Sequence, residues 1–298
     1  MNNHYKPVVV WFQAVTCNGN THSLLSANSS RFELFLNSFN LIYHPSLTID
    51  SSLEEIINNE DLHIDFLLVE GAITKNKEFF CINERSTTSL LRRLTKKTKY
   101  LISVGSCASY GGVHKKFEQN SHIVGVEDII SKDKYPNLKN EIVNLTGCPV
   151  HPEWIIQTMF SLSRFKTIAL DDEKRPKELY SNLAHHGCTR NEYFEWKIEG
   201  EFGQKEGCLF YEQGCRGPMT HSSCNKILWN DVSSKTRAGM PCIGCTEKTF
   251  PRDNMLETIK NIGIPQEVPL GVSKRAYLSI TGVAKTFKID RLNKKLMD

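Results

Sequence analysis

The first half of the chain alternates short apolar runs with longer stretches of helical character. Four runs have the length of single strands and are rich in β-branched and aromatic residues: 8–12, 66–69, 100–104 and 142–145. Helical stretches lie between or after them, at 53–59, 86–97 and 153–165. Continuous apolar runs of this length are typical of strands buried on both faces. The series predicts an α/β fold built on an open, doubly wound parallel sheet.

The pattern changes after about residue 163. Segment 171–177 is charged and interrupted by a proline, as expected of a linker, and the rest of the chain has few periodic apolar segments. We therefore predict two domains, 1–170 and 178–298, of which the second is rich in loops. A region with so little apolar core needs another source of stability, such as bound metal clusters.

The overall composition is that of an ordinary globular protein. The 298 residues are 40% hydrophobic and 23% charged, and 37 basic against 33 acidic side chains give a formal charge of +4. These charges are spread along the chain, so nucleic-acid binding is not indicated.

We find no targeting signal in the amino-acid sequence. The N-terminus carries neither a secretory peptide nor a twin-arginine motif, and no window approaches the ~20 apolar residues that span a bilayer. We therefore expect a cytoplasmic protein, either free or held at the inner membrane through partners. In this reducing compartment clustered thiols indicate metal or redox chemistry.

The ten cysteines carry the clearest chemical signal. Nine of them fall in patterns typical of iron–sulfur ligation. Six of the nine lie in one stretch that begins with His185: Cys188, Cys208, Cys215, Cys224, Cys242 and Cys245. The tenth, Cys81, has no cysteine nearby and is expected to pack as a small hydrophobic residue.

The other three cysteines each follow a predicted strand. Cys17 follows the first, Cys107 the third and Cys148 the fourth. Open parallel sheets bind ligands beyond the carboxyl ends of their strands, so these thiols are expected to converge on one crevice. Glu70 reaches the same edge from the second strand. It either caps a turn there or acts at a subunit interface or in proton movement.

Zinc is the main alternative to iron. Zinc modules usually show two short ligand pairs, whereas this chain has a single Cys-x-x-Cys, Cys242 with Cys245. The pair Cys208 and Cys215 is spaced too widely for a zinc knuckle. Nine thiols and one imidazole divide more naturally into groups of three and four, as iron–sulfur clusters require.

The motifs, taken in order, resemble the small subunit of [NiFe]-hydrogenases from about residue 8 to residue 253. The matching segments are 11–13, 16–20 (Thr-Cys-Asn-Gly-Asn), 69–71 (Val-Glu-Gly), 105–108 (Gly-Ser-Cys-Ala), 147–149 (Gly-Cys-Pro), 185–188 (His-x-x-Cys), 207–208, 214–218 (Gly-Cys-Arg-Gly-Pro) and 241–247 (Pro-Cys-Ile-Gly-Cys-Thr-Glu). The resemblance implies a flavodoxin-like domain followed by a domain that binds iron–sulfur clusters.

The resemblance also implies three clusters. A proximal cluster would be held by Cys17, Cys107 and Cys148, a medial 3Fe–4S cluster by Cys224, Cys242 and Cys245, and a distal 4Fe–4S cluster by His185, Cys188, Cys208 and Cys215. The domain 1–170 would hold the proximal cluster, and the domain 178–298 would hold the medial and distal clusters.

Two positions depart from the family pattern. Asn20 stands where the family usually has the second cysteine of a Cys-x-x-Cys pair, so the proximal cluster is expected to be 3Fe–4S, or 4Fe–4S with an oxygen or nitrogen ligand. Asn20 is the first candidate for that ligand and Glu70 the second. Lys235 stands where the family carries proline or cysteine, which favours three irons in the medial cluster.

The implied function is electron transfer from H2 oxidation. The family's Ni–Fe site lies on a large subunit, so we expect no catalytic residue in this chain and an obligate heterodimer. The missing export signal and the Cys-x-Gly-Asn motif resemble the cytosolic uptake and H2-sensing branch. Two hypotheses remain, an uptake enzyme with a redox partner or a sensor that signals to a histidine kinase.

Overall fold

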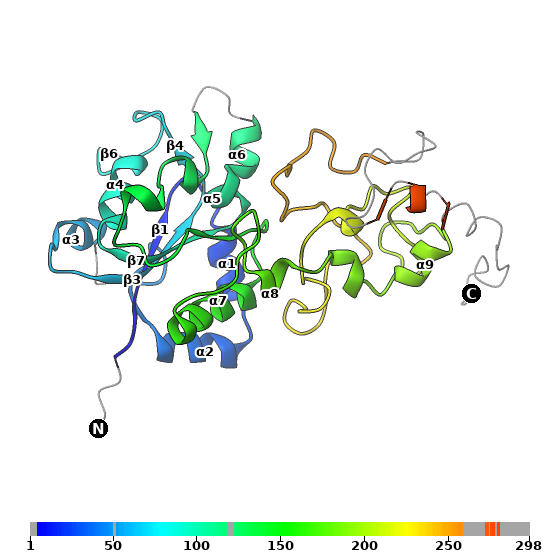
Figure 1. The fold of residues 1–298 in the computed structure, drawn as a ribbon, viewed down its shortest axis with the longest axis horizontal. Helices are drawn as coiled ribbons and strands as arrows, with labels where there is room; N and C mark the ends of the chain where they lie inside the picture. The colour runs from blue at the N-terminus through cyan, green and yellow to red at the C-terminus, as the bar shows by residue number, and fades with distance from the viewer. Residues whose placement is uncertain are drawn as a thin grey trace. The chain divides into compact units, whose positions relative to one another are not determined.

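The chain divides into two compact units, Met1–Leu179 and Tyr180–Asp298. The computed structural model describes residues 5–49, 52–117, 122–258, 272–273, 275–277 and 279–280. The predicted second domain runs to residue 298, and its residues 281–298 lie outside the described ranges. Figure 1 shows both units, coloured along the chain.

The first unit is built on a sheet of five parallel strands. Their spatial order is β2-β1-β3-β7-β9, and their bounds are β1 Val8–Gln13, β2 Asn40–Tyr43, β3 Ile64–Glu70, β7 Thr98–Val104 and β9 Val143–Leu145. When only the five strands of this sheet are numbered in chain order, their spatial order is 2-1-3-4-5. This is the flavodoxin-like arrangement. The four predicted strands and the α/β class are thus confirmed. The edge strand β2 was missed, because it is only four residues long and its residues are half-buried or exposed.

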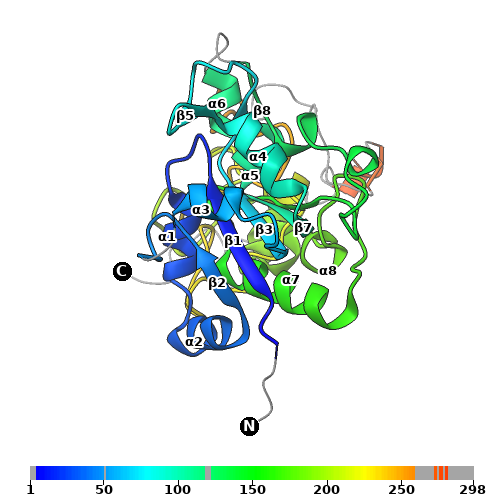
Figure 2. The same cartoon turned by 90° about the vertical axis from the view of Figure 1, so that its left-hand side faces the viewer.

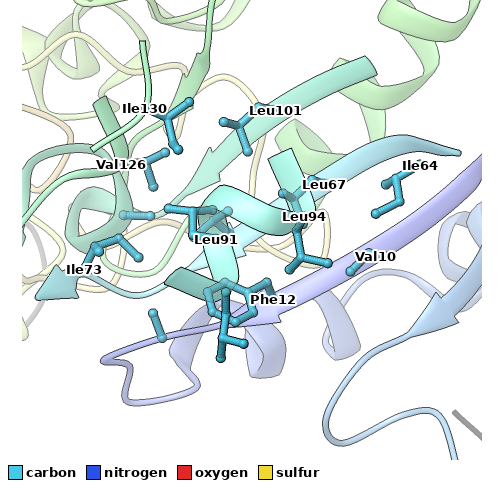
Figure 3. Close-up of a cluster of buried hydrophobic side chains, with 14 of the residues drawn as sticks. Val10, Phe12, Ile64, Leu67, Ile73, Leu91, Leu94, Leu101, Val126 and Ile130 are labelled. Carbon is cyan, nitrogen blue, oxygen red and sulfur yellow. The ribbon is translucent and has the colours of Figure 1, made fainter. Parts of the chain in front are cut away.

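One face of the sheet is covered by α3 (Leu53–Asn58) and α4 (Thr87–Thr95). Alternate strand residues such as Val10, Phe12 and Leu101 point into this layer, where Leu91 and Leu94 of α4 meet them (Figure 3). All five side chains are at most 1% exposed. Burial of this kind stabilises by about 25 cal/mol per Å² of apolar surface, so this face supplies much of the unit's core.

The opposite face is covered by α1 (Gly19–Leu25), α2 (Ser29–Ser38) and α7 (Pro152–Phe165). Figure 2 shows α4 on one side of the sheet and α2 with α7 on the other. Phe39 anchors this second layer, because its ring meets Phe66 of β3 at 5.7 Å and Phe160 of α7 at 5.1 Å. The sheet is therefore doubly wound, as the sequence predicted.

Helix ends follow ordinary capping chemistry. The predicted helices at 53–59, 86–97 and 153–165 are α3, α4 and α7. Ser52 caps α3 in a capping box with Glu55, and the hydroxyl of Ser86 accepts from the backbone N–H of Ser89 at the start of α4.

The remaining elements of this unit are short: β4 Ile73–Thr74, β5 Cys81–Ile82, β6 Arg85–Ser86, α5 Ser106–Tyr110, α6 Gly112–Phe117, β8 Ile123–Val124, the 3₁₀ turns Val126–Asp128 and Lys132–Lys134, and α8 Lys177–Tyr180.

The second unit has little regular structure in its described residues. Its helical elements include the 3₁₀ turns Ala184–Gly187 and Gly217–Met219 and the helix α9 Asn191–Glu195, and residues 275–277 and 279–280 are also helical. Its apolar cluster contains Phe194, Phe210 and Tyr277 together with three cysteines, Cys208, Cys215 and Cys242. Cysteines that were predicted as metal ligands thus form part of an apolar core of this unit.

Candidate metal centres

The strands of the first unit end in one row. Gln13 of β1 pairs with Glu70 of β3, Glu70 with Val104 of β7, and Val104 with Leu145 of β9. The loops that leave this row are therefore neighbours at the carboxyl edge of the sheet. The edge includes the point between β1 and β3 where the strand order reverses, which is where doubly wound sheets bind ligands.

The three predicted proximal cysteines all lie just beyond this row. Cys17 lies between β1 and α1 and is exposed, whereas Cys107 on the first turn of α5 and Cys148 after β9 are half-buried. Cys17 is close enough to Cys107 that the two thiols interact electrostatically. A Cβ added at Gly19 would lie 3.3 Å from Cys17 Sγ and 3.8 Å from Pro149 Cβ, so the loops of Cys17 and Cys148 touch.

Two pairs of hydrogen bonds tie the three loops together. The backbone N–H of Ser106 donates to Gly147 O at 2.9 Å, and the N–H of Gly147 donates to Ser106 Oγ at 3.0 Å. The Cys107 and Cys148 loops are joined by this reciprocal pair. The amide side chain of Asn20 makes the other pair: Oδ1 accepts from the N–H of Val150 at 2.9 Å, and Nδ2 donates to Val104 O at 3.2 Å.

The side chain of Cys107 depends on a glycine. Gly112 has φ +51, and a Cβ there would lie 2.8 Å from Cys107 Sγ. Any other residue would press on the thiol. Burial raises the pKa of Cys107, and backbone N–H groups of Val113 and His114 partly oppose that shift. Without a metal this thiol is protonated at neutral pH, so binding iron there must release a proton.

Asn20 itself is buried and fully engaged. It is 8% exposed, and both heteroatoms of its amide bond to backbone groups of neighbouring loops. Gly105 leaves space for it, because a Cβ at that position would lie 2.5 Å from Asn20 Nδ2. The amide oxygen has a second lone pair. Its role as an iron ligand therefore stays a prediction, and its role in fastening the loops is visible in the structure.

Glu70, the last residue of β3, caps the N-terminus of helix α1. The N-cap residue of α1, Asn18, offers no side-chain hydrogen bond. Instead, Glu70 Oε1 accepts from the backbone N–H of Asn20 at 2.9 Å and of Thr21 at 3.2 Å. An acidic group beside the first turn of a helix stabilises the free N–H groups there.

The carboxylate of Glu70 is fully buried and fully satisfied. It is 0% exposed and accepts six hydrogen bonds. Besides the two backbone groups of α1, the donors are Thr21 Oγ1 at 2.5 Å, Trp11 Nε1 at 3.0 Å, Gln13 Nε2 at 3.2 Å and Thr16 Oγ1 at 3.2 Å. A site of donors only suits a carboxylate, which can only accept. These contacts make Glu70 a cap of helix α1, and its expected roles at an interface or in proton movement stay predictions.

His44 extends this network further into the protein. Its Nδ1 accepts from the backbone N–H of Ser46 at 3.0 Å, so the proton sits on Nε2, which donates to Thr21 Oγ1 at 3.3 Å. The ring also packs against Trp11, with centroids 5.2 Å apart. Burial lowers the pKa of His44 to about 4 despite the nearby charge of Glu70. The imidazole is therefore neutral at physiological pH.

In the second unit, the predicted distal ligands line one small cavity. It is lined by His185, Cys188, Cys208 and Cys215, with Arg190, Phe210, Gly217 and Pro218 among the other walls. Burial lowers the pKa of His185 to about 4, which leaves its nitrogens free of the extra proton that would prevent metal binding. The edge of Phe194 packs on this ring, with centroids 4.4 Å apart.

Two of the three cysteines of this cavity, Cys208 and Cys215, are buried, and Cys188 is half-buried. Burial raises the pKa of Cys208 to about 12 and also raises that of Cys215. The Sγ of Cys188 accepts from the N–H of Arg190 at 3.4 Å, and the Sγ of Cys215 accepts from the N–H of Gly217 at 3.4 Å. Amide donors to ligating sulfur are one of the means by which proteins tune iron–sulfur clusters.

The predicted medial ligands form a second group. The thiols of Cys224, Cys242 and Cys245 are near enough to influence one another electrostatically. Burial raises the pKa of Cys224 to about 11, and the ammonium of Lys235 acts in the opposite direction. The two groups adjoin, because the N–H of Cys242 donates to Cys215 Sγ at 3.3 Å.

The donor chemistry of all three groups fits iron–sulfur clusters. Each group contains three thiols, at least one of them buried or half-buried, and the cavity group adds a neutral imidazole. In the described part of the chain, no three His, Cys, Asp or Glu side chains converge closely enough to hold a single metal ion.

The structure corrects the sequence interpretation of one residue and adds two residues that the sequence interpretation did not include. Cys81 does not pack as a hydrophobic residue: it is exposed on the hairpin of β5 and β6, and its thiol donates to Lys77 O at 3.0 Å. Sequence reasoning also missed His44 and Arg190. Only the position of Arg190, two residues after a predicted ligand, could have drawn attention to it.

Comparison with known families covers both units. The family model of the NADH ubiquinone oxidoreductase 20 Kd subunit matches residues 17–162, and that of the C-terminal region of the NiFe/NiFeSe hydrogenase small subunit matches residues 180–257. The periplasmic [NiFeSe] hydrogenase small subunit of Desulfomicrobium baculatum is 30% identical over 271 residues, which are 83% of this chain and 85% of the relative. The Hydrogenase-2 small chain of Escherichia coli K12 is 29% identical and covers 88% of this chain and 73% of its own length.

Solved structures agree with these relatives. The [NiFeSe]-hydrogenase of Desulfomicrobium baculatum matches with a TM-score of 0.74 and 28% identity over 85% of this chain and 99% of that one. The actinobacterial-type NiFe-hydrogenase of Ralstonia eutropha H16 matches with a TM-score of 0.75 over 97% of this chain and 92% of that one; at 23% identity it supports the fold alone.

Fold and relatives together define a subunit of a hydrogenase, a class of oxidoreductase. Within that class the chain belongs to the small-subunit family of [NiFe]-hydrogenases. Among the described residues, no helix has the length and apolar character needed to cross a membrane.

Proposed function

We propose that this chain relays electrons from H2 oxidised at the Ni–Fe site of a large-subunit partner, through three iron–sulfur clusters. The observation that carries the proposal is the hydrogen bond from Cys242 N–H to Cys215 Sγ. It makes one candidate cluster site the direct neighbour of another. Adjacent cluster sites in a protein whose family consists of hydrogenase subunits favour a wire for electrons over an isolated structural metal.

The assignment of residues follows the observed groups. Cys17, Cys107 and Cys148 would hold the proximal cluster in the first domain, 3Fe–4S or 4Fe–4S. In the second domain Cys224, Cys242 and Cys245 would hold a medial 3Fe–4S cluster. The cavity residues His185, Cys188, Cys208 and Cys215 would hold a distal 4Fe–4S cluster. Such clusters supply one-electron transfer at potentials set by their surroundings.

The first domain would face the large subunit. Cys17 is exposed in the chain taken alone, although an iron–sulfur cluster is normally shielded from water. A partner that covers this edge of the sheet would complete the shielding, so we infer an obligate heterodimer. Glu70 would then act as a positioning residue, because its six hydrogen bonds fix the segment that carries Cys17 and Asn20.

Within the family we assign the chain to the uptake branch, and the H2 sensor that signals to a histidine kinase is the second candidate. Both would have the same clusters, and they differ in turnover. The cytoplasmic location expected from the sequence stays a prediction, since the relatives include periplasmic enzymes. Steady-state H2 oxidation by the purified heterodimer separates the branches, because a sensor would turn over far more slowly than an uptake enzyme.

Anaerobic co-purification with any bound partner tests the central proposal. We expect a brown complex that contains iron, acid-labile sulfide and, on the partner, nickel. Electron paramagnetic resonance should show iron–sulfur signals that respond to H2. A colourless preparation with zinc and no labile sulfide would overturn the proposal.

A further inference from the structure

Arg190 is a buried cation beside the candidate distal site. The residue is 3% exposed, and its guanidinium donates to four backbone carbonyls of described residues. Nε donates to Thr236 O at 2.8 Å, Nη1 donates to Glu206 O at 3.0 Å and to Gly207 O at 2.6 Å, and Nη2 donates to Gln204 O. These bonds hold the loop that leads into Cys208 against the segment around Thr236.

The charge of Arg190 has no matching carboxylate among the residues that the structure describes. Carbonyl groups satisfy its N–H donors but carry no net charge. A guanidinium cannot shed its proton in a protein, and an unpaired buried charge costs several kcal/mol. A neighbouring group that carries negative charge would offset this cost.

The neighbours of Arg190 are the candidate ligands. It lines the same cavity as His185, Cys188, Cys208 and Cys215. Its own backbone N–H donates to Cys188 Sγ at 3.4 Å. Its charge also lowers the pKa of Cys208 and Cys215, against burial, which raises both more strongly. Three thiolates that bind a metal cluster would bring negative charge to the side of the cavity where Arg190 lies.

We propose that Arg190 is the built-in counter-cation of the distal cluster and holds its reduction potential above the value that three thiolates alone would set. The inference rests on the proposed function, because it requires a cluster in the cavity. A nearby cation favours the reduced, more negative state of a cluster. The charge of Arg190 thus influences electron flow by raising the reduction potential of the distal cluster. Its four hydrogen bonds to carbonyl groups hold the guanidinium in place beside the cavity.

Two variants of the purified heterodimer separate charge from bracing. Arg190→Gln removes the charge, whereas Arg190→Lys keeps a charge but loses the fork of donors. The matched control is Arg237→Gln, which removes an exposed charge from the adjacent segment, where water screens it. The measurement is a redox titration followed by electron paramagnetic resonance. The distal signal is identified as the one that Cys208→Ser abolishes.

We expect the distal potential to shift to a more negative value in Arg190→Gln and to stay near wild type in Arg190→Lys and Arg237→Gln. If Arg190→Gln fails to assemble the cluster, retention of the cluster by Arg190→Lys still supports a role of the charge. An unchanged distal potential in Arg190→Gln would overturn the inference, as would equal loss of the cluster in both variants. A wild-type complex without iron and labile sulfide would instead refute the proposed function.

Discussion

The backbone N–H of Val150 donates a 2.9 Å hydrogen bond to the amide oxygen of Asn20, across 130 positions of the chain. This bond fastens the loop after Cys148 to the first turn of α1, directly after Cys17. The other end of the same amide bonds to Val104 O at the end of β7. One side chain thereby joins the three segments that carry the candidate proximal cysteines.

The position of Asn20 leads to a prediction about cluster composition. We predict that Asn20→Cys converts a three-iron proximal cluster towards a four-iron one, because it supplies the fourth thiol at the position where the family usually has cysteine. Iron content should rise by about one atom per complex, and the resonance of the three-iron form should disappear.

The matched control for this variant is Asn20→Ala. Alanine removes the same two hydrogen bonds but offers no ligand, so it should loosen the loops without adding iron. If Asn20→Cys leaves both the iron count and the spectrum as in wild type, residue 20 does not lie where a cluster ligand can act.

Glu70 leads to a prediction about stability. The change Glu70→Gln puts an amide NH2 among six groups that all donate, so at least one buried donor loses its acceptor. We expect a loss of about 2 kcal/mol in the free energy of unfolding, together with lower iron occupancy at the proximal site. Thermal unfolding and iron analysis of the full chain measure the two effects.

An exposed glutamate provides the comparison. Glu60 lies on the surface, and Glu60→Gln should change stability by less than about 0.5 kcal/mol. Equal stability of the two variants would mean that the network around Glu70 contributes nothing to the fold.

His44 leads to a prediction about pH. Its pKa falls from 6.5 in the unfolded chain to about 4 in the fold. Between these values the unfolded chain binds the extra proton, so stability from this group is present above pH 6.5 and is lost as the pH falls towards 4. From pH 7 to pH 5.5 we expect the fold to lose about 1 kcal/mol through His44.

The measurement is the unfolding temperature of the full chain over that pH interval. His44→Gln should flatten the dependence, because the titrating group is gone. His22 is exposed on α1, and His22→Gln should leave the slope as in wild type. A wild-type slope in the His44 variant would show that His44 binds its proton equally well in the folded and unfolded chain.

The cavity of the second unit leads to a prediction about metal content. Cys208→Ala should remove the distal cluster, about four iron atoms, and leave the other two in place. Cys81→Ser is the control, since Cys81 is exposed on the hairpin of β5 and β6 and is not one of the candidate ligands. Equal iron content in these two variants would contradict the assignment of Cys208 as a ligand.

Much of this architecture could be predicted from the sequence. The four central strands and helices α3, α4 and α7 follow from apolar runs and capping residues, because period and capping are local properties. The edge strand β2 escaped prediction, since its apolar stretch at 41–43 is short and its pairing with β1 is not visible in the sequence. The cysteine spacings identified the candidate ligands for a related reason: thiols at such intervals have few other uses in a globular chain.

The sequence by itself determined the fold class, the family resemblance and the set of candidate ligands. The tertiary structure decided what surrounds those ligands. Glu70 caps a helix whose Thr21 lies 49 residues before it, His44 reaches the same carboxylate through Thr21, and Arg190 lies beside Cys208 and Cys215 and donates to backbone carbonyls. Burial and electrostatics depend on contacts between residues far apart in the chain. Such contacts exist only once the sheet and the loops have folded.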